Sequence, residues 1–201
     1  MAIPILPYSV EHYNSLPELR EAKDQFKSSG ASEILFTEIG PALVRHHVEN
    51  ILGVVLLHNH FLLSQNEKLV DVGSVAVPCA EELPNVSASS WRFTDEGIAP
   101  YEFVRSASKT SLAQMEPFLA EFRTIINKWK LGNVFGICSL KEGSVGGPVT
   151  TEFTSGRANI TLPFDIAPND GNVVDAMWQF SSAPPSSSMQ AASMAQGKSK
   201  R

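Results

Sequence analysis

Four of the five histidines in this chain fall between positions 46 and 60, and two of them are the residues best placed to do chemistry. His58 and His60 follow a short run of valines and leucines and are separated by one residue. On a β-strand, side chains two positions apart lie on the same face. Two imidazole nitrogens can then converge on one ion, so the spacing predicts that His58 and His60 bind a metal.

Two carboxylates follow the histidines in the sequence, Glu67 and Asp71, and either can supply a third ligand. A set of two histidines and one carboxylate leaves open positions for water or substrate, and it suits Zn or Fe(II). Zn lowers the pKa of a bound water so that it attacks as hydroxide near neutral pH, whereas Fe(II) supports oxygen chemistry. The best mechanistic hypothesis from the sequence is therefore a small enzyme of hydrolase or oxygenase type that uses one divalent metal.

This stretch resembles two known metal-binding patterns in part. The first motif of cupins has a His-x-His pair between two glycines with a Glu after it, and the same order occurs here with different spacings. The motif of JAMM-type peptidases places an Asp ten residues after His-x-His, which Asp71 satisfies. Neither pattern is complete, because no histidine follows His60 for a second cupin motif and Phe61 stands where the peptidase motif has proline.

A second interpretation gives the histidines no function. Short patterns often match by chance, and a half-buried strand can carry two histidines as ordinary polar residues. The chain would then be a non-catalytic protein that binds a small ligand or a protein partner. The two cysteines, Cys79 and Cys138, are predicted to be reduced thiols in the core, since two cysteines are too few for a disulfide framework.

The composition argues against several other functions. The 201 residues carry 16 basic and 21 acidic side chains, a net charge of −5, which is the wrong sign for a phosphate backbone, so no nucleic-acid partner is expected. No phosphate-binding glycine motif opens a helix. The sequence has no apolar run of 18 residues and no signal-like order near its start, so we expect a cytoplasmic protein that does not interact with membranes.

The elements that must hold these residues indicate an α+β fold. Strands are predicted over 34–39, 52–61 and 69–77, because these segments are rich in Val, Ile and Leu and are bounded by turns. Apolar residues recur every three or four positions over 115–129, which predicts an amphipathic helix packed on one face of the sheet. Strands that are not regularly separated by helices favour an antiparallel or mixed sheet.

The chain is predicted to divide into one domain and a tail. Residues 1–180 contain nearly all the large apolar side chains and should form a single α+β domain. Residues 181–201 are mainly Ser, Ala, Pro, Gln and Met and end in Lys198, Lys200 and Arg201, so we expect a disordered tail with a basic end. The oligomeric state is left open.

Overall fold

The computed structural model describes residues 3–105, 110–141, 149–165, 173–182 and, for the backbone, 191–195. Within these ranges the chain has the α+β character predicted from the sequence, with one mixed sheet and several short helices. The helices are α1 (Val10–Asn14), α2 (Leu19–Ser28), α3 (Ala31–Ile34), a π-helical turn (Leu35–Ile39), α4 (Gly40–Arg45), a 3-10 turn (Leu112–Met115) and α5 (Glu116–Lys128). No helix among the described residues is long and apolar enough to span a membrane.

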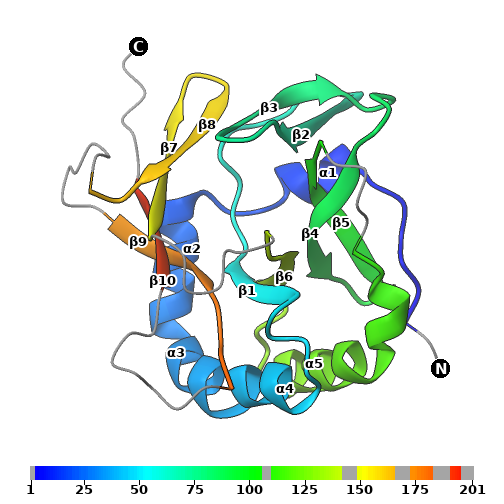
Figure 1. The fold of residues 1–201 in the computed structure, drawn as a ribbon, viewed down its shortest axis with the longest axis vertical. Helices are drawn as coiled ribbons and strands as arrows, with labels where there is room; N and C mark the ends of the chain where they lie inside the picture. Colours follow the sequence, from blue (N-terminus) through cyan, green and yellow to red (C-terminus); the bar gives the residue numbers. More distant parts are fainter. Residues whose placement is uncertain (1–2, 106–109, 142–148, 166–172, 183–190, 196–201) are drawn as a thin grey trace.

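The ten strands of the sheet are not adjacent in the order in which they occur in the chain. They are β1 (Leu52–Leu56), β2 (Glu67–Asp71), β3 (Val75–Ala80), β4 (Ser87–Phe93), β5 (Ile98–Val104), β6 (Phe135–Ser139), β7 (Thr150–Ser155), β8 (Ala158–Pro163), β9 (Val173–Trp178) and β10 (Ala191–Ala195). Their order across the sheet is β10-β9-β1-β6-β4-β5-β2-β3-β8-β7, and only β2 and β5 pair in parallel. The sheet curls so that β7 and β10, from its two ends, lie side by side (Figure 1).

Two apolar clusters pack on the sheet. In the larger one, α2 to α5 bury their apolar side chains against strand residues such as Leu56, Phe135 and Trp178. The helix predicted over 115–129 corresponds to α5. It contributes Phe118 and Phe122 to this cluster and is one of several helices that pack there. The smaller cluster joins α1 to residues of β1, β2, β5 and β6, and the candidate site borders it.

Two segments differ from their predicted structure. Residues 34–39 were expected as a strand but are helical, because the apolar residues before and after them continue the spacing of three and four residues from Ala31 to Leu43. Within the predicted tail, residues 191–195 pair with β9 and so satisfy the hydrogen-bonding groups of an edge that would otherwise be open. The other tail residues from 183 onward lie outside the described residues.

Candidate functional site

The loop that follows β1 carries both histidines, and backbone hydrogen bonds at Leu57 and Asn59 hold it in place. β1 ends at Leu56, so His58 and His60 lie just beyond the strand on which they were predicted. The amide of Leu57 donates to the carbonyl of Val134 at 2.9 Å, and the amide of Asn59 donates to the carbonyl of Pro17 at 2.9 Å. The histidines are therefore fixed from two sides by backbone that is distant in sequence.

Helix α1 holds the same loop through side-chain hydrogen bonds to its backbone. The buried phenol of Tyr13 accepts a hydrogen bond from the amide of His60 at 3.2 Å. The side chain of Asn14 makes two bonds to Leu63, donating to its carbonyl at 2.8 Å and accepting from its amide at 2.9 Å. A short helix of five residues thus sets the path of the backbone on both sides of His60.

His58 is a neutral, buried imidazole with one free nitrogen. Only 4% of the residue is exposed, and its Nδ1 lies 2.8 Å from the carbonyl oxygen of Leu56. Because a carbonyl only accepts, Nδ1 carries the proton and Nε2 keeps its lone pair. Nε2 finds no hydrogen-bond partner among the described residues. Burial, and next the charge of His60, lower the pKa of His58 to about 4.

His60 lies at the centre of a cluster of polar side chains. Its Nε2 is 3.5 Å from Oε1 of Glu102 and 4.0 Å from Oε2 of Glu152. The ring also meets that of His58 edge to face, with ring centres 4.9 Å apart. Two carboxylates thus lie near one imidazole nitrogen. We call His58, His60, Glu102, Glu152 and Asn159 the His60 cluster.

Glu102 reaches the cluster from β5 at a point where the strand pairing is irregular. It pairs with Ser90 of β4, and the register shifts on both sides of this pair. Such bulges change the direction of side chains and often occur beside functional sites. The hydroxyl of Ser90 donates to Oε2 of Glu102 at 2.9 Å, which leaves Oε1 turned to His60.

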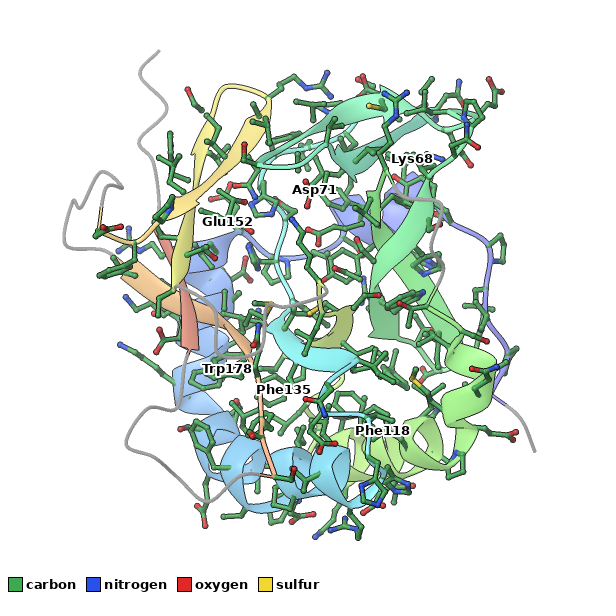
Figure 2. All side chains as sticks on the ribbon, in the orientation of Figure 1. Lys68, Asp71, Phe118, Phe135, Glu152 and Trp178 are labelled. Atoms are coloured by element: carbon green, nitrogen blue, oxygen red, sulfur yellow. The ribbon has the colours of Figure 1, made fainter. Side chains whose placement is uncertain are left out.

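The β7–β8 hairpin supplies the other carboxylate. Asn159 of β8 donates from Nδ2 to Oε2 of Glu152 at 2.6 Å, and the same nitrogen lies 3.3 Å from Nε2 of His60. Thr161, directly opposite Glu152 in the hairpin, donates to its other oxygen at 3.4 Å. Figure 2 shows the labelled Glu152 and Asp71 in the upper half of the molecule, away from the labelled Phe118 and Phe135 of the helix-covered core.

The surroundings push the pKa values of the two carboxyls apart. Burial raises the pKa of both, but the hydrogen bond and charge of His60 outweigh burial at Glu102 and bring its pKa below the ordinary value. At Glu152 burial prevails, with help from the charge of Glu102, and the pKa is raised. The pKa of His60 is raised because the two carboxylates outweigh its burial. These shifts favour an ion pair between Glu102 and His60, and Glu152 is the carboxyl that holds a proton more readily.

This arrangement has the components of acid–base chemistry. Carboxyls whose pKa values are driven apart can serve as a proton donor and a proton acceptor toward the same bound molecule. The side chains of Glu102 and Glu152 keep 23% and 26% of their surface accessible although they lie in the interior, while His60 keeps 8%. The carboxylates are therefore not fully enclosed by protein atoms.

The two carboxylates proposed from the sequence as metal ligands have other partners. Glu67 binds Arg157, with an Nη2 to Oε2 distance of 2.5 Å, and this bond helps to lower the pKa of Glu67 to about 2. Asp71 binds Lys141 at 2.8 Å through Oδ2. The structure brings His58 and His60 together, and the carboxylates that it places beside them are Glu102 and Glu152. Among the described residues, no group of three His, Cys, Asp or Glu side chains has the geometry to hold a metal ion.

The cysteines agree with their prediction as free thiols in the described chain. Cys138 is buried in β6, where burial raises its pKa to about 12, so it is a thiol rather than a nucleophilic thiolate at neutral pH. Cys79, on β3, is partly exposed, so its predicted place in the core is wrong.

Sequence reasoning missed Glu102, Glu152 and Asn159. Glu102 stands between Tyr101 and Phe103 and looks like the outward residue of an alternating strand. The strand pairing is irregular on both sides of Glu102, and such an irregularity has no sequence signal in this strand. Glu152 and Asn159 share one face of a hairpin, a pairing that the alternation of polar and apolar residues in 150–163 could have suggested.

Comparison with models of protein families, with curated proteins and with solved structures found no match for this chain. The function therefore has to be argued from the His60 cluster itself.

Proposed function

We propose that this chain binds a small polar molecule and that the His60 cluster is its binding site. The observation that carries the proposal is the convergence of His60, Glu102 and Glu152, from a loop and two strands distant in sequence, with distances of 3.5 and 4.0 Å between the polar atoms. Placing charged groups in the interior costs stability unless each is well paired. A group of such residues with shifted pKa values is more typical of a functional site than of a core.

The unpaired atoms of the cluster support the same proposal. Nε2 of His58 and Oδ1 of Asn159 belong to residues that are 4% and 3% exposed, and neither atom has a hydrogen-bond partner among the described residues. Leaving a buried polar atom unpaired costs about 1–3 kcal/mol. A bound molecule that pairs with these atoms would recover that energy as affinity. Because the pKa values of Glu152 and Glu102 are shifted in opposite directions, the same site can also transfer protons to and from the molecule that it binds.

A screen of small polar fragments of varied charge and shape tests this proposal. We expect some fragments to raise the melting temperature of the protein at millimolar concentration, and to lose this effect in the Glu102→Gln and Glu152→Gln variants. Glu121→Gln is the matched control, since Glu121 pairs with His46 and Arg45 outside the cluster. If no fragment acts, or if all act equally on the three variants, the proposal is wrong.

A second candidate is the metal-dependent enzyme inferred from the sequence, with Zn for hydrolysis or Fe(II) for oxygen chemistry. One observation favours it. The Nδ1 proton of His58 is held by a backbone carbonyl and its Nε2 is bare, which is the arrangement found in metal-binding histidines. Glu67 or Asp71 would have to exchange Arg157 or Lys141 for the metal.

Elemental analysis of protein purified without a histidine tag decides between the two candidates. About one equivalent of a transition metal, lost in the His58→Ala/His60→Ala variant, would establish the metal enzyme. Less than about 0.2 equivalents after reconstitution would exclude it.

We further propose that the protein works in the cytoplasm. The two free cysteines are compatible with a reducing compartment such as the cytoplasm. Imaging of a fluorescent fusion tests this location, and fluorescence confined to another compartment would contradict it.

A further inference from the structure

The buried side-chain atoms of the His60 cluster that lack a hydrogen-bond partner among the described residues are acceptors. Nε2 of His58 carries a lone pair, because the proton of this ring is on Nδ1 and is donated to Leu56. Oδ1 of Asn159 is an acceptor, because the amide is oriented by the donation of its Nδ2 to Glu152. Neither atom has a partner among the described residues, and both residues are more than nine-tenths buried.

The ionisable groups around these acceptors are mainly carboxyls. Glu102 and Glu152 both keep about a quarter of their side-chain surface accessible. Asp71, whose charge acts on Glu152, is paired with Lys141 through Oδ2, and its Oδ1 is buried without a partner among the described residues. Within the cluster, His60 is the group that takes up positive charge more readily, and Oε1 of Glu102 lies 3.5 Å from its Nε2.

We propose that the His60 cluster binds the cationic nitrogen of an organic molecule, a protonated amine or a guanidinium group. Such a group donates several hydrogen bonds and carries a positive charge, so it pairs with the free acceptors and the accessible carboxylates together. An anion would meet the free acceptors and the carboxylates, and the imidazole of His60, the one group that could attract it, already lies beside Glu102. A neutral alcohol offers a single donor, which satisfies one acceptor and leaves the rest unpaired.

An organic cation also fits the geometry better than a metal ion does. A transition metal needs three or more ligand atoms at bonding distance from one point, and no described group of His, Cys, Asp and Glu side chains provides this. An ammonium group accepts looser spacing, because its hydrogen bonds span about 2.7–2.9 Å and reach atoms in different directions. The separations of 3.5 and 4.0 Å between His60 and its carboxylates are compatible with a donor that approaches from the accessible side.

Titration calorimetry with a matched set of small molecules tests the inference, which rests on the proposed function. The probes are n-butylammonium and butylguanidinium as cations, n-butanol as the neutral analogue and butyrate as the anion. The buffers are phosphate and MOPS, neither of which contains a primary amine. We expect at least one cation to bind at least tenfold more tightly than butanol and butyrate.

Variants of the two carboxylates test whether the cation binds at the His60 cluster. Glu152→Gln and Glu102→Gln should each weaken cation binding tenfold or more, whereas Glu121→Gln should leave it unchanged. The comparison of probes on the natural chain stands even if a variant fails to fold. Tight stoichiometric binding of Zn²⁺ that displaces the cation would overturn the inference in favour of a metal site.

The inference and the proposed function fail in different ways. Binding of butanol or butyrate as tight as that of the cations, or fragments from the screen that are neutral or anionic and still require Glu152, would overturn the cation inference and leave the binding site in place. Absence of binding by every probe and every fragment would overturn both.

Discussion

Two histidines separated by one residue have pKa values shifted in opposite directions in this protein. His58 is neutral because burial, and next the charge of His60, lower its pKa to about 4. The pKa of His60 is raised because two carboxylates outweigh its burial. The difference comes from what each ring contacts, since both have the same ordinary pKa. At the scale of single residues, the contacts of each imidazole determine how readily it holds a proton.

The neutral state of His58 should make the stability depend on pH. Below about pH 6.5 the unfolded chain takes up a proton at His58, but the folded protein does so only near its pKa of about 4. Falling pH in this window therefore favours the unfolded chain, by up to about 3 kcal/mol once pH 4 is reached. Urea unfolding between pH 4 and 7 should show a smaller loss for His58→Gln than for the natural protein. Equal losses would show that His58 is not buried in its neutral form.

The charged state of His60 should depend on Glu102. Replacing Glu102 with Gln removes the hydrogen bond and the charge that raise the pKa of His60, so this pKa should fall. Titration of the imidazole resonances by NMR measures the change directly. The Glu121→Gln variant removes a carboxylate that pairs with His46, outside the cluster, and should leave the pKa of His60 unaltered. A pKa of His60 that is the same in Glu102→Gln and the natural protein would contradict the ion pair.

At the scale of elements, the site depends on the clamp between α1 and the loop after β1. The sequence did not predict α1, because five residues are too few to show a periodic pattern. It did predict that His58 and His60 would lie close to each other, although they lie beyond the end of β1 rather than on a strand. Segment 34–39 was assigned wrongly because a short apolar run is compatible with a strand or a buried helix.

The clamp itself can be weakened at one residue. Asn14→Ala removes two hydrogen bonds to the backbone of Leu63 and leaves buried or half-buried groups unpaired, so it should cost about 1–3 kcal/mol of stability. Hydrogen exchange should show faster opening at the amide of Leu63. Asn127→Ala, at an exposed position of α5, is the control and should change stability by less than about 0.5 kcal/mol. A neutral effect of Asn14→Ala would mean that the loop holds its path without α1.

The close approach of β4 and β6 requires a glycine. A Cβ atom at Gly136 would lie 2.5 Å from the carbonyl oxygen of Trp91 and 2.8 Å from the side chain of Leu57, where the site loop begins. Gly136→Ala should therefore destabilise the protein by about 1–3 kcal/mol. Gly132→Ala is the matched control, because a Cβ there meets no atom within 4 Å. Chemical denaturation that gives the two variants equal stability would contradict the packing of these strands.

At the scale of the whole molecule, the curled sheet is what assembles the site. Local patterns predicted an α+β chain with an antiparallel or mixed sheet, and the sheet is mixed. They did not predict that β5 and the β7–β8 hairpin would meet the loop after β1, since such pairings depend on strand order rather than on any local segment. This is why Glu67 and Asp71, which are near the histidines in sequence, were preferred to Glu102 and Glu152.

The most direct test of the account is the imidazole NMR spectrum of the intact protein at neutral pH, recorded without ligand and with n-butylammonium. We expect His58 to be a neutral ring with its proton on Nδ1 and His60 to be charged. The resonances of both rings should move when the cation is added. His46 and His47, which directly follow α4, should not move. A neutral His60, a proton on Nε2 of His58, or resonances that stay in place at saturating butylammonium and with every fragment from the screen would contradict it.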